Sequence, residues 1–244
     1  MNYAVFKNLI SDKFKSYIGI VLSEKQCHKF FMYMNLLIER NKVMNLTAIT
    51  EPEEIVVRHF LDSSMPVKFY EKDLSSENYI VDIGTGAGFP GLPLAILCPS
   101  CRFVLNDTLG KRINFLSDVL SEIKLSNVEL VKARIEDFAH DKRYREKFDF
   151  VFSRGVSRIS VLSEYSLPLV SVNGKMIAFK MDNCDEELSE GANAIKVLGG
   201  KFHVKHSYSI IEGEPERCLI EISKDKKSPN QYPRKAGTPS KNPL

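Results

Sequence analysis

The chain has 244 residues, of which 43% are hydrophobic and 27% charged, a mixture that fits one α/β domain with an extension. No apolar run is long enough to cross a membrane and the N-terminus lacks the order of a signal peptide, so we expect a cytoplasmic protein without membrane contact. Five cysteines, an odd number, fit free thiols, no set of residues has the spacing of a metal site, and the net charge is only +3.

Helices are predicted for the N-terminal part of the chain. Apolar residues recur at helical spacing over residues 4–18. Ser23 and Gln26 have the spacing of a capping box at the start of a second helix, and Pro52 begins a third. We therefore predict a helical extension over residues 1–70, ahead of a sheet.

A glycine-rich stretch follows the first predicted strand, Tyr79–Val81. Asp82 comes directly after the strand, and an apolar segment that suits a helix follows the glycines. Glycine has no Cβ and accepts positive φ, and a helix N-terminus has free N–H groups, so this arrangement brings backbone close to a ligand. The four glycines fall within eight residues and are Gly84, Gly86, Gly88 and Gly91.

Two classes of ligand fit this stretch, and a tight turn without a ligand is the third interpretation. The spacing Gly86-x-Gly88-x-x-Gly91 formally matches a dinucleotide fingerprint. The alternative ligand is S-adenosylmethionine (SAM), whose ammonium group Asp82 could hold directly or through water. The same carboxylate would repel a pyrophosphate, and Pro90 removes an N–H that a phosphate would need. We therefore favour SAM over NAD.

Strands and helices alternate after the glycines, which predicts a parallel sheet in a domain over residues 71–223. Asp107 ends the second strand, 21 residues after Gly86, where a carboxylate can take both hydroxyls of a ribose. After the third strand, Ile135 could lie against an adenine ring and Glu136 could meet its amino group. The alternative for Glu136 is an ordinary acid at a helix N-terminus.

The fourth predicted strand ends at Ser153-Arg154-Gly155, and residues beyond the carboxyl ends of such strands face the ligand crevice. Arg154 is therefore a candidate to bind a carboxylate or a phosphate, with a surface ion pair as the alternative. The last two predicted strands form an antiparallel hairpin, unlike the six parallel strands of a dinucleotide fold. This closing hairpin also favours SAM.

Residues 224–244 carry six basic residues, one acid and four prolines, which predicts a basic tail without a regular helix or central strand. Tyr232 with Arg234 and Lys235 combines an aromatic ring with two cations, which suits stacking on bases and pairing with phosphates. The alternative is a solvated tail without a partner.

The sequence resembles the glucose-inhibited division protein B family, bacterial 16S rRNA guanine-N7 methyltransferases. The first and last matching motifs make the resemblance specific, whereas many methyltransferases share the glycine-rich loop. The sequence departs from the usual pattern at Arg40, Ile135 and Gly155. The matching motifs are Asn41-x-x-x-Asn45-Leu46-Thr47, His59-Phe60-Leu61-Asp62-Ser63, Asp82 to Gly91, Asp107 with Lys111-Arg112-Ile113, Ser153-Arg154, and Tyr232-Pro233-Arg234-Lys235-Ala236-Gly237-Thr238-Pro239.

The resemblance implies a class I SAM-dependent methyltransferase, with a Rossmann-like α/β sheet, an antiparallel closing hairpin and an N-terminal helical extension. It implies SAM contacts at Gly84, Phe89, Ile135, Glu136 and Arg154, to which the residue patterns add Asp82, Gly86 and Asp107. It also implies that the substrate is 16S rRNA or the small ribosomal subunit. We expect RNA contacts from Arg58, His59, Tyr232, Arg234 and Lys235.

Guanine N7 has a free lone pair, so we expect no general base, and Arg154 is the one candidate for a catalytic role. We also expect a monomer without a metal ion. Three other hypotheses stay open at this point: a SAM enzyme acting on a protein or small molecule, a non-catalytic RNA-binding module, and an NAD oxidoreductase.

Overall fold

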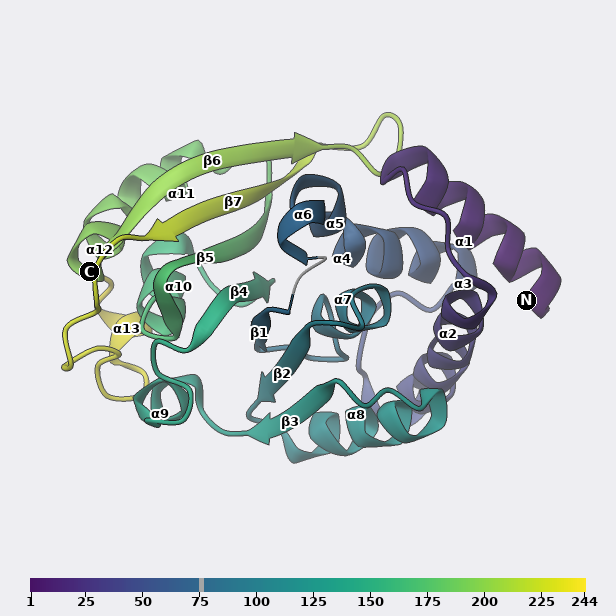
Figure 1. The fold of residues 1–244 in the computed structure, drawn as a ribbon, viewed down its shortest axis with the longest axis horizontal. Coiled ribbons are helices and arrows are strands. Elements are labelled where there is room, and N and C mark those ends of the chain that lie inside the picture. Colours follow the sequence, from purple (N-terminus) through teal and green to yellow (C-terminus); the bar gives the residue numbers. More distant parts are fainter. Residues whose placement is uncertain (75–76) are drawn as a thin grey trace.

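A seven-stranded sheet forms the centre of the computed structural model, which describes residues 1–74 and 77–244 (Figure 1). The strand order is β3-β2-β1-β4-β5-β7-β6, with β1 to β5 parallel and β7 antiparallel to both β5 and β6. The order reverses beside β1, which has β2 on one side and β4 on the other, and open α/β sheets bind ligands at such a point. The strands are β1 (Tyr79–Ile83), β2 (Arg102–Asp107), β3 (Val128–Lys132), β4 (Phe148–Arg154), β5 (Val170–Met181), β6 (Gly200–Tyr208) and β7 (Arg217–Lys224).

Helices cover both faces of the sheet, and each face has its own core. Ile80 and Phe150 belong to the core under the N-terminal helices, α7 and α8, whereas Val81 and Val151 belong to the core under α9 to α12. This alternation follows from the two-residue period of a strand. The helices are α1 (Tyr3–Tyr17), α2 (Glu24–Met44), α3 (Pro52–Glu54), the π-helix η1 (Ile55–Leu61), α4 (Asp62–Ser64), α5 (Pro66–Phe69), α6 (Glu71–Leu74), α7 (Gly91–Leu97), α8 (Gly110–Ile123), α9 (Ile135–His140), α10 (Ile159–Ser166), α11 (Asp185–Glu190), α12 (Ala192–Val197) and α13 (Thr238–Lys241).

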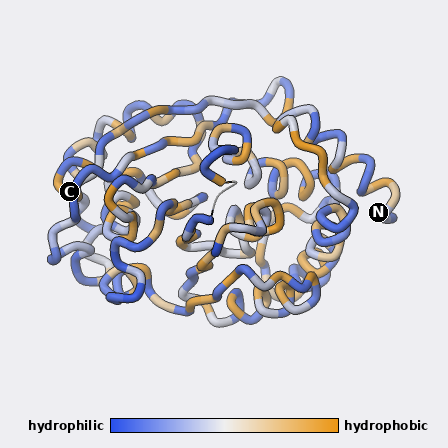
Figure 2. Tube along the Cα trace, viewed as in Figure 1, coloured by the Kyte–Doolittle hydropathy of each residue, from blue (hydrophilic) through white to orange (hydrophobic). Residues whose placement is uncertain are grey.

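Hydropathy follows this layering. The strands at the centre of the sheet and the helix α7 are largely hydrophobic, whereas hydrophilic residues gather on the outer helices and loops (Figure 2). In the described part of the chain, no helix is long and apolar enough to cross a bilayer.

The helical extension packs directly on the glycine-rich loop. The predicted capping box is confirmed, because Ser23 Oγ accepts from the Gln26 amide and Gln26 Oε1 accepts from the Ser23 amide. From α2, the buried Tyr33 hydroxyl donates to the Ala87 carbonyl within the loop. The helix predicted from Pro52 contains a π-helical segment, η1, a type of helix that is rare and often found at functional sites.

Two boundaries differ from those that the sequence pattern favours. Asn173-Gly174 favours a turn with a strand starting at Lys175, but β5 begins at Val170, because an irregularity in its pairing with β4 keeps that turn inside the strand. The pattern of residues 184–198 favours one helix, but the structure has two short helices there, α11 and α12. They meet at Gly191, where a Cβ would lie 2.5 Å from Ile159 Cγ2, so the backbone approaches α10 more closely than another residue would allow.

The C-terminal segment, residues 224–244, lies against α9 and α10 (Figure 1). It contains the one-turn helix α13. Its first residue, Lys224, is buried, and its ammonium group donates to the Leu167 carbonyl and to Ser228 Oγ. Burial lowers the pKa of Lys224 to about 8. Parts of the segment are therefore packed on the domain, which the alternative of a solvated tail does not describe.

Candidate active site

A cavity of about 820 Å³ opens where strands β1, β2 and β3 end. We call it the β1–β3 cavity. It brings together Gly84, Asp107, Ile135 and Glu136, four of the residues expected to bind the cofactor. Its full lining is Ile83, Gly84, Asn106, Asp107, Thr108, Leu109, Arg112, Lys132, Ala133, Arg134, Ile135, Glu136, Gly155 and Val156.

The glycine-rich loop forms one wall of this cavity. Gly84 has a φ of +65°, and a Cβ there would lie 2.7 Å from Val156 Cγ2, inside the lining. At Gly91 a Cβ would lie 2.1 Å from Leu105 Cδ2 and 2.9 Å from Asp82 Oδ2. Glycine is thus required at Gly84 to keep the cavity open, and at Gly91 to let α7 start against the sheet.

Asp82 lies beneath the loop and is fully buried. Its Oδ2 accepts from Thr85 Oγ1 at 2.6 Å and from the Gly91 amide at 2.9 Å, so the side chain holds the loop in shape. Its Oδ1 has no hydrogen-bond partner among the described residues. Burial raises the pKa of Asp82 to about 7, although these two hydrogen bonds act in the opposite direction. Asp82 is not in the lining of this cavity, so in this structure it acts on the site through the loop that it holds. Its unpaired Oδ1 is the acceptor that an ammonium group could still use.

Asp107 occupies the second wall and is nearly fully buried. Its Oδ2 accepts from the Gly86 amide at 3.0 Å and from the Arg112 guanidinium at 3.1 Å, and its Oδ1 accepts from the Leu109 amide at 2.9 Å. The carboxylate therefore ties the loop after β1 to the loop after β2. Gly86 serves the site through this bond and is not itself in the lining.

Helix α9 supplies the third wall through its first two residues, Ile135 and Glu136. The Glu136 side chain is mostly buried, and its Oε1 accepts from the Gly237 amide of the C-terminal segment at 3.1 Å. The carboxylate is thus held in place, as an acceptor for the amino group of a purine would need to be.

Phe89 and Arg154 are placed outside the lining of the β1–β3 cavity. The Phe89 ring stacks on His59, with centroids 4.4 Å apart and planes 14° apart. The Arg154 guanidinium lies 5.0 Å from the centre of the same ring. Phe89 therefore joins the glycine-rich loop to the helical extension instead of facing the cavity between the strand ends.

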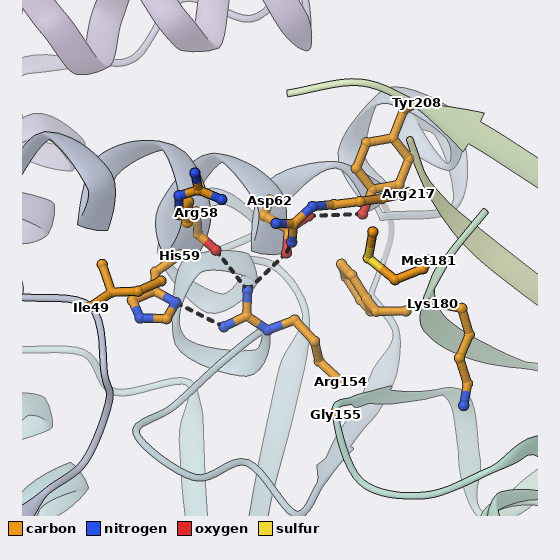
Figure 3. A pocket seen from close by; sticks show the side chains of 11 residues that line it. Ile49, Arg58, His59, Asp62, Arg154, Gly155, Lys180, Met181, Tyr208 and Arg217 are labelled. Atoms are coloured by element: carbon orange, nitrogen blue, oxygen red, sulfur yellow. Dashed lines mark hydrogen bonds and ion pairs between the residues drawn. The ribbon is translucent and has the colours of Figure 1, made fainter. Parts of the chain in front are cut away.

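Arg154 lines a second cavity, of about 440 Å³. We call it the Arg154 cavity (Figure 3). The Arg154 guanidinium donates to Asp62 Oδ2 at 2.9 Å, to the Arg58 carbonyl at 3.1 Å and to His59 Nδ1 at 3.1 Å. The other lining residues come from the extension and from β5, β6 and β7, and are Ile49, Gly155, Phe179, Lys180, Met181, Tyr208 and Arg217.

Asp62 is the centre of the polar network in this cavity and is almost inaccessible to solvent. Besides Arg154, it accepts from Arg217 at 3.0 Å and from the Tyr208 hydroxyl at 2.9 Å. Figure 3 shows the carboxylate between the two guanidinium groups. One acid with two cations leaves the network with one net positive charge, which favours an electron-rich or anionic ligand.

His59 is mostly buried, and burial, followed by the charge on Arg154, lowers its pKa to about 3. The ring is therefore neutral. Because Arg154 donates to Nδ1, the proton is on Nε2 and is donated to Thr47 Oγ1 at 2.8 Å. Both ring nitrogens are thus occupied, and one face of the ring is covered by Phe89. Contact between His59 and an RNA phosphate would need this packing to open.

The other residues expected to contact RNA differ in their exposure to solvent and in their partners within the protein. Arg58 makes a double hydrogen bond to Glu214, with one contact of 2.9 Å, and lies at the edge of the Arg154 cavity. The Tyr232 ring is buried and cannot offer a face for base stacking, and Arg234 is paired with Glu164 at 2.7 Å. Lys235 is exposed. Base stacking on Tyr232 would therefore need the ring to leave its buried position, and its role in RNA binding stays a prediction.

Gly155 lines both cavities, so they lie on either side of the residue that follows β4. Sequence reasoning missed Asp62, Tyr208, Lys180 and Arg217 as site residues. Asp62 alone gave a signal, because it stands in the motif His59-Phe60-Leu61-Asp62-Ser63, which carries part of the family resemblance.

Comparison with known proteins assigns the chain to a family. The model of GidB, described as rRNA small subunit methyltransferase G, matches residues 26–213. The chain belongs to this family. A "Ribosomal RNA small subunit methyltransferase G" from Lactococcus lactis subsp. cremoris is 46% identical over 225 residues, covering 92% of this chain and 94% of that protein. The protein of the same name from Oceanobacillus iheyensis is 47% identical, covering 93% and 94%.

Solved structures support the fold. A 16S rRNA (adenine(1408)-N(1))-methyltransferase from Catenulisporales acidiphilia, crystallised with SAM, is similar with a TM-score of 0.52 at 13% identity, covering 67% of this chain and 93% of that one. TrmN from Thermus thermophilus also gives a TM-score of 0.52, at 14% identity, covering 69% and 53%. This GidB family member is therefore a SAM-dependent methyltransferase with a class I fold, as the glycine-rich loop and the closing hairpin predicted.

Proposed function

We propose that this GidB family member transfers the methyl group of SAM to N7 of a guanine in 16S rRNA of the small ribosomal subunit, in the cytoplasm. The observation that carries the proposal is that the two cavities are neighbours, because Gly155 lines both. The β1–β3 cavity, with Gly84, Asp107 and Glu136, would hold SAM. The Arg154 cavity would hold the guanine.

The residues of the Arg154 cavity support a transfer that needs no general base. His59 is neutral, and each of its ring nitrogens already has a hydrogen-bond partner. Asp62 is occupied by Arg154, Arg217 and Tyr208. Neither group is free to accept a proton, and guanine N7 has none to give. Base chemistry is required for an N–H or O–H acceptor, so this cavity favours a ring nitrogen with a free lone pair.

What the chain then contributes is alignment. SAM supplies a methyl group on a sulfonium, which is already a good leaving group. The protein has to hold N7, the methyl carbon and the sulfur in line and keep water out. Orientation of two bound reactants can lower the barrier by about 7–11 kcal/mol. Phe89, packed between the loop and His59, fixes the two cavities relative to each other.

RNA contact is proposed for Arg58, at the edge of the Arg154 cavity, and for the exposed Lys235. Phosphate binding at Arg58 would compete with Glu214, which now occupies its guanidinium. The Asp62 network would add positive potential at the mouth of the cavity.

The experiment uses 16S rRNA and 30S subunits from a strain that lacks this gene. Purified protein is incubated with each substrate and with SAM carrying an isotopically labelled methyl group. Nucleosides are then identified by mass spectrometry, and the position is mapped by chain cleavage at 7-methylguanosine. One labelled 7-methylguanosine is expected. A methyl group on another atom, or transfer to proteins or metabolites but not to rRNA, would overturn the proposal.

A further inference from the structure

The C-terminal segment brackets helix α9, the helix that carries two residues of the β1–β3 cavity. At the start of α9, the Gly237 amide donates to Glu136 Oε1 at 3.1 Å. At its end, His140 Nε2 donates to the Pro233 carbonyl at 2.7 Å. We call residues 233–237 the C-terminal clasp. The clasp therefore contacts both ends of one short helix.

The clasp is itself anchored by a buried ion pair. Glu164 on α10 is fully buried and accepts from Arg234 through the backbone amide at 2.7 Å, through Nε at 3.0 Å and through a terminal nitrogen at 2.7 Å. Arg145 holds the preceding residues, because its guanidinium donates to the Tyr232 carbonyl at 2.7 Å. Such forked, charge-assisted hydrogen bonds fix geometry as well as adding energy.

Helix α9 is anchored in the core by Phe138 and Ala139, but its first turn, at the cavity, is held from outside by the clasp. It is only six residues long, and its N-cap, Arg134, makes no side-chain capping hydrogen bond. Isolated helices of this length are unstable in water, so tertiary packing decides where α9 lies. Its first turn places Ile135 and Glu136 in the β1–β3 cavity.

We propose that the C-terminal clasp sets the affinity for SAM, by holding the Glu136 carboxylate in the β1–β3 cavity, and that Arg234 is the positioning residue for this. A carboxylate has about four lone-pair sites, so the bond from Gly237 orients Glu136 and leaves acceptor capacity for the amino group of the adenine. The inference rests on the SAM site of the proposed function, but not on the identity of the methyl acceptor. It gives a role to a segment that the sequence pattern assigned to RNA.

The first test uses the unmodified protein. If clasp docking promotes SAM binding, SAM must stabilise the docked clasp by the same factor. Hydrogen exchange is measured at the amides of Arg234 and Gly237 with and without saturating SAM. Slower exchange with SAM is expected at both amides. Unchanged exchange at both, while the amides of the glycine-rich loop become protected, would overturn the proposal.

The second test compares variants. Arg234→Ala should weaken SAM binding by about tenfold or more in calorimetry. Arg234→Lys should restore part of the affinity, because lysine keeps the charge but not the fork. Lys241→Ala, an exposed change in the same segment, is the matched control and should have no effect. At saturating SAM, kcat and the KM for rRNA should stay near the unmodified values, which a general loss of structure would not allow.

Two outcomes of the variant test would sink the idea. In the first, Arg234→Ala leaves SAM affinity within about twofold although exchange shows the clasp released. In the second, the variant loses rRNA affinity and keeps SAM affinity, which would return the segment to RNA binding. Should Arg234→Ala fail to fold, the exchange test on the unmodified protein decides. If the protein binds SAM but does not methylate rRNA, the proposed function fails. The inference about the clasp is then still tested by the measurements of SAM binding.

Discussion

The β1–β3 cavity and the Arg154 cavity open at the same edge of the sheet but are assembled differently. The first is built mainly from loops that directly follow consecutive strands, and backbone groups near Gly84 and Gly86 shape it. The second depends on Asp62, whose partners Arg154 and Arg217 lie 92 and 155 residues away along the chain. The cofactor site is thus fixed by local backbone geometry, whereas the proposed substrate site is fixed by long-range ion pairs.

The largest expected effect on SAM affinity comes from breaking the first cavity alone. Gly84→Asp should weaken SAM binding by about 100-fold or more, about 2.7 kcal/mol, because the new side chain occupies the cavity where a Cβ already meets Val156. The fold should remain, since aspartate tolerates positive φ better than most residues. Calorimetry measures the affinity and circular dichroism the fold.

Gly19→Asp is the matched control for Gly84→Asp. Gly19 also has a positive φ, +90°, and nothing lies within 4 Å of a Cβ there. This variant should bind SAM normally. Unchanged SAM affinity in Gly84→Asp itself would show that the cofactor lies elsewhere.

The next effect should break the second cavity alone. Asp62→Asn removes the charge that Arg154 and Arg217 share, and loss of one partner from a buried ion pair costs about 3–5 kcal/mol. We expect that loss in chemical denaturation, together with loss of methyl transfer, while SAM affinity is retained. Asp118→Asn, which breaks an exposed pair with Arg40, should cost less than about 1 kcal/mol. If Asp62→Asn weakens SAM binding as much as Gly84→Asp, the two cavities are not independent.

A smaller effect concerns pH. The buried Asp82 has a pKa of about 7, so it is largely protonated at about pH 6 and must ionise to pair with the SAM ammonium group. SAM affinity should therefore rise between about pH 6 and about pH 8, and calorimetry with Asp82→Asn should show weaker binding without this rise. A rise of the same size in Asp82→Asn would assign it to another group.

The same pKa has a consequence for stability without SAM. It is raised from 3.8 in the absence of burial, so the protonated form stabilises the fold, and that contribution is lost as pH rises from about 4 through about 7. The free energy of unfolding is measured for the unmodified protein and for Asp82→Asn across this range. It should fall with rising pH in the unmodified protein only, so the advantage of the unmodified protein over the variant should shrink or reverse. A constant difference would contradict the assigned pKa.

The smallest expected effect separates RNA contact from internal packing in the C-terminal segment. Lys235→Gln removes an exposed cation and should lower rRNA affinity modestly. The slope of the logarithm of the binding constant against the logarithm of the salt concentration should become shallower by about 1, the value for one lost phosphate contact. Tyr232→Phe, at a buried ring, should leave RNA binding unchanged in filter-binding titrations at several salt concentrations. A strong loss of RNA affinity in Tyr232→Phe would mean that the ring leaves its buried position when RNA binds.

The sequence by itself determined the features that depend on neighbouring residues. The glycines and Asp82 predicted SAM as the cofactor, which the family confirms, and the strand pattern predicted the closing hairpin, which the sheet confirms. Both could be predicted because backbone freedom and strand periodicity act over a few residues, whereas the SAM contacts of single residues stay predictions. The motifs with them indicated the GidB family.

Only the tertiary structure decided which groups the charged and aromatic side chains meet. The family resemblance implied that Arg154 and Phe89 contact the cofactor, and the residue pattern of the C-terminal segment offered Tyr232 and Arg234 to RNA. The fold instead gave Arg154 to Asp62, Phe89 to His59 and Arg234 to the buried Glu164. A cation's charge does not say whether its partner belongs to a ligand or to a segment many residues away. That choice depends on which distant carboxylates the fold buries beside it, because a buried charge has to be paired.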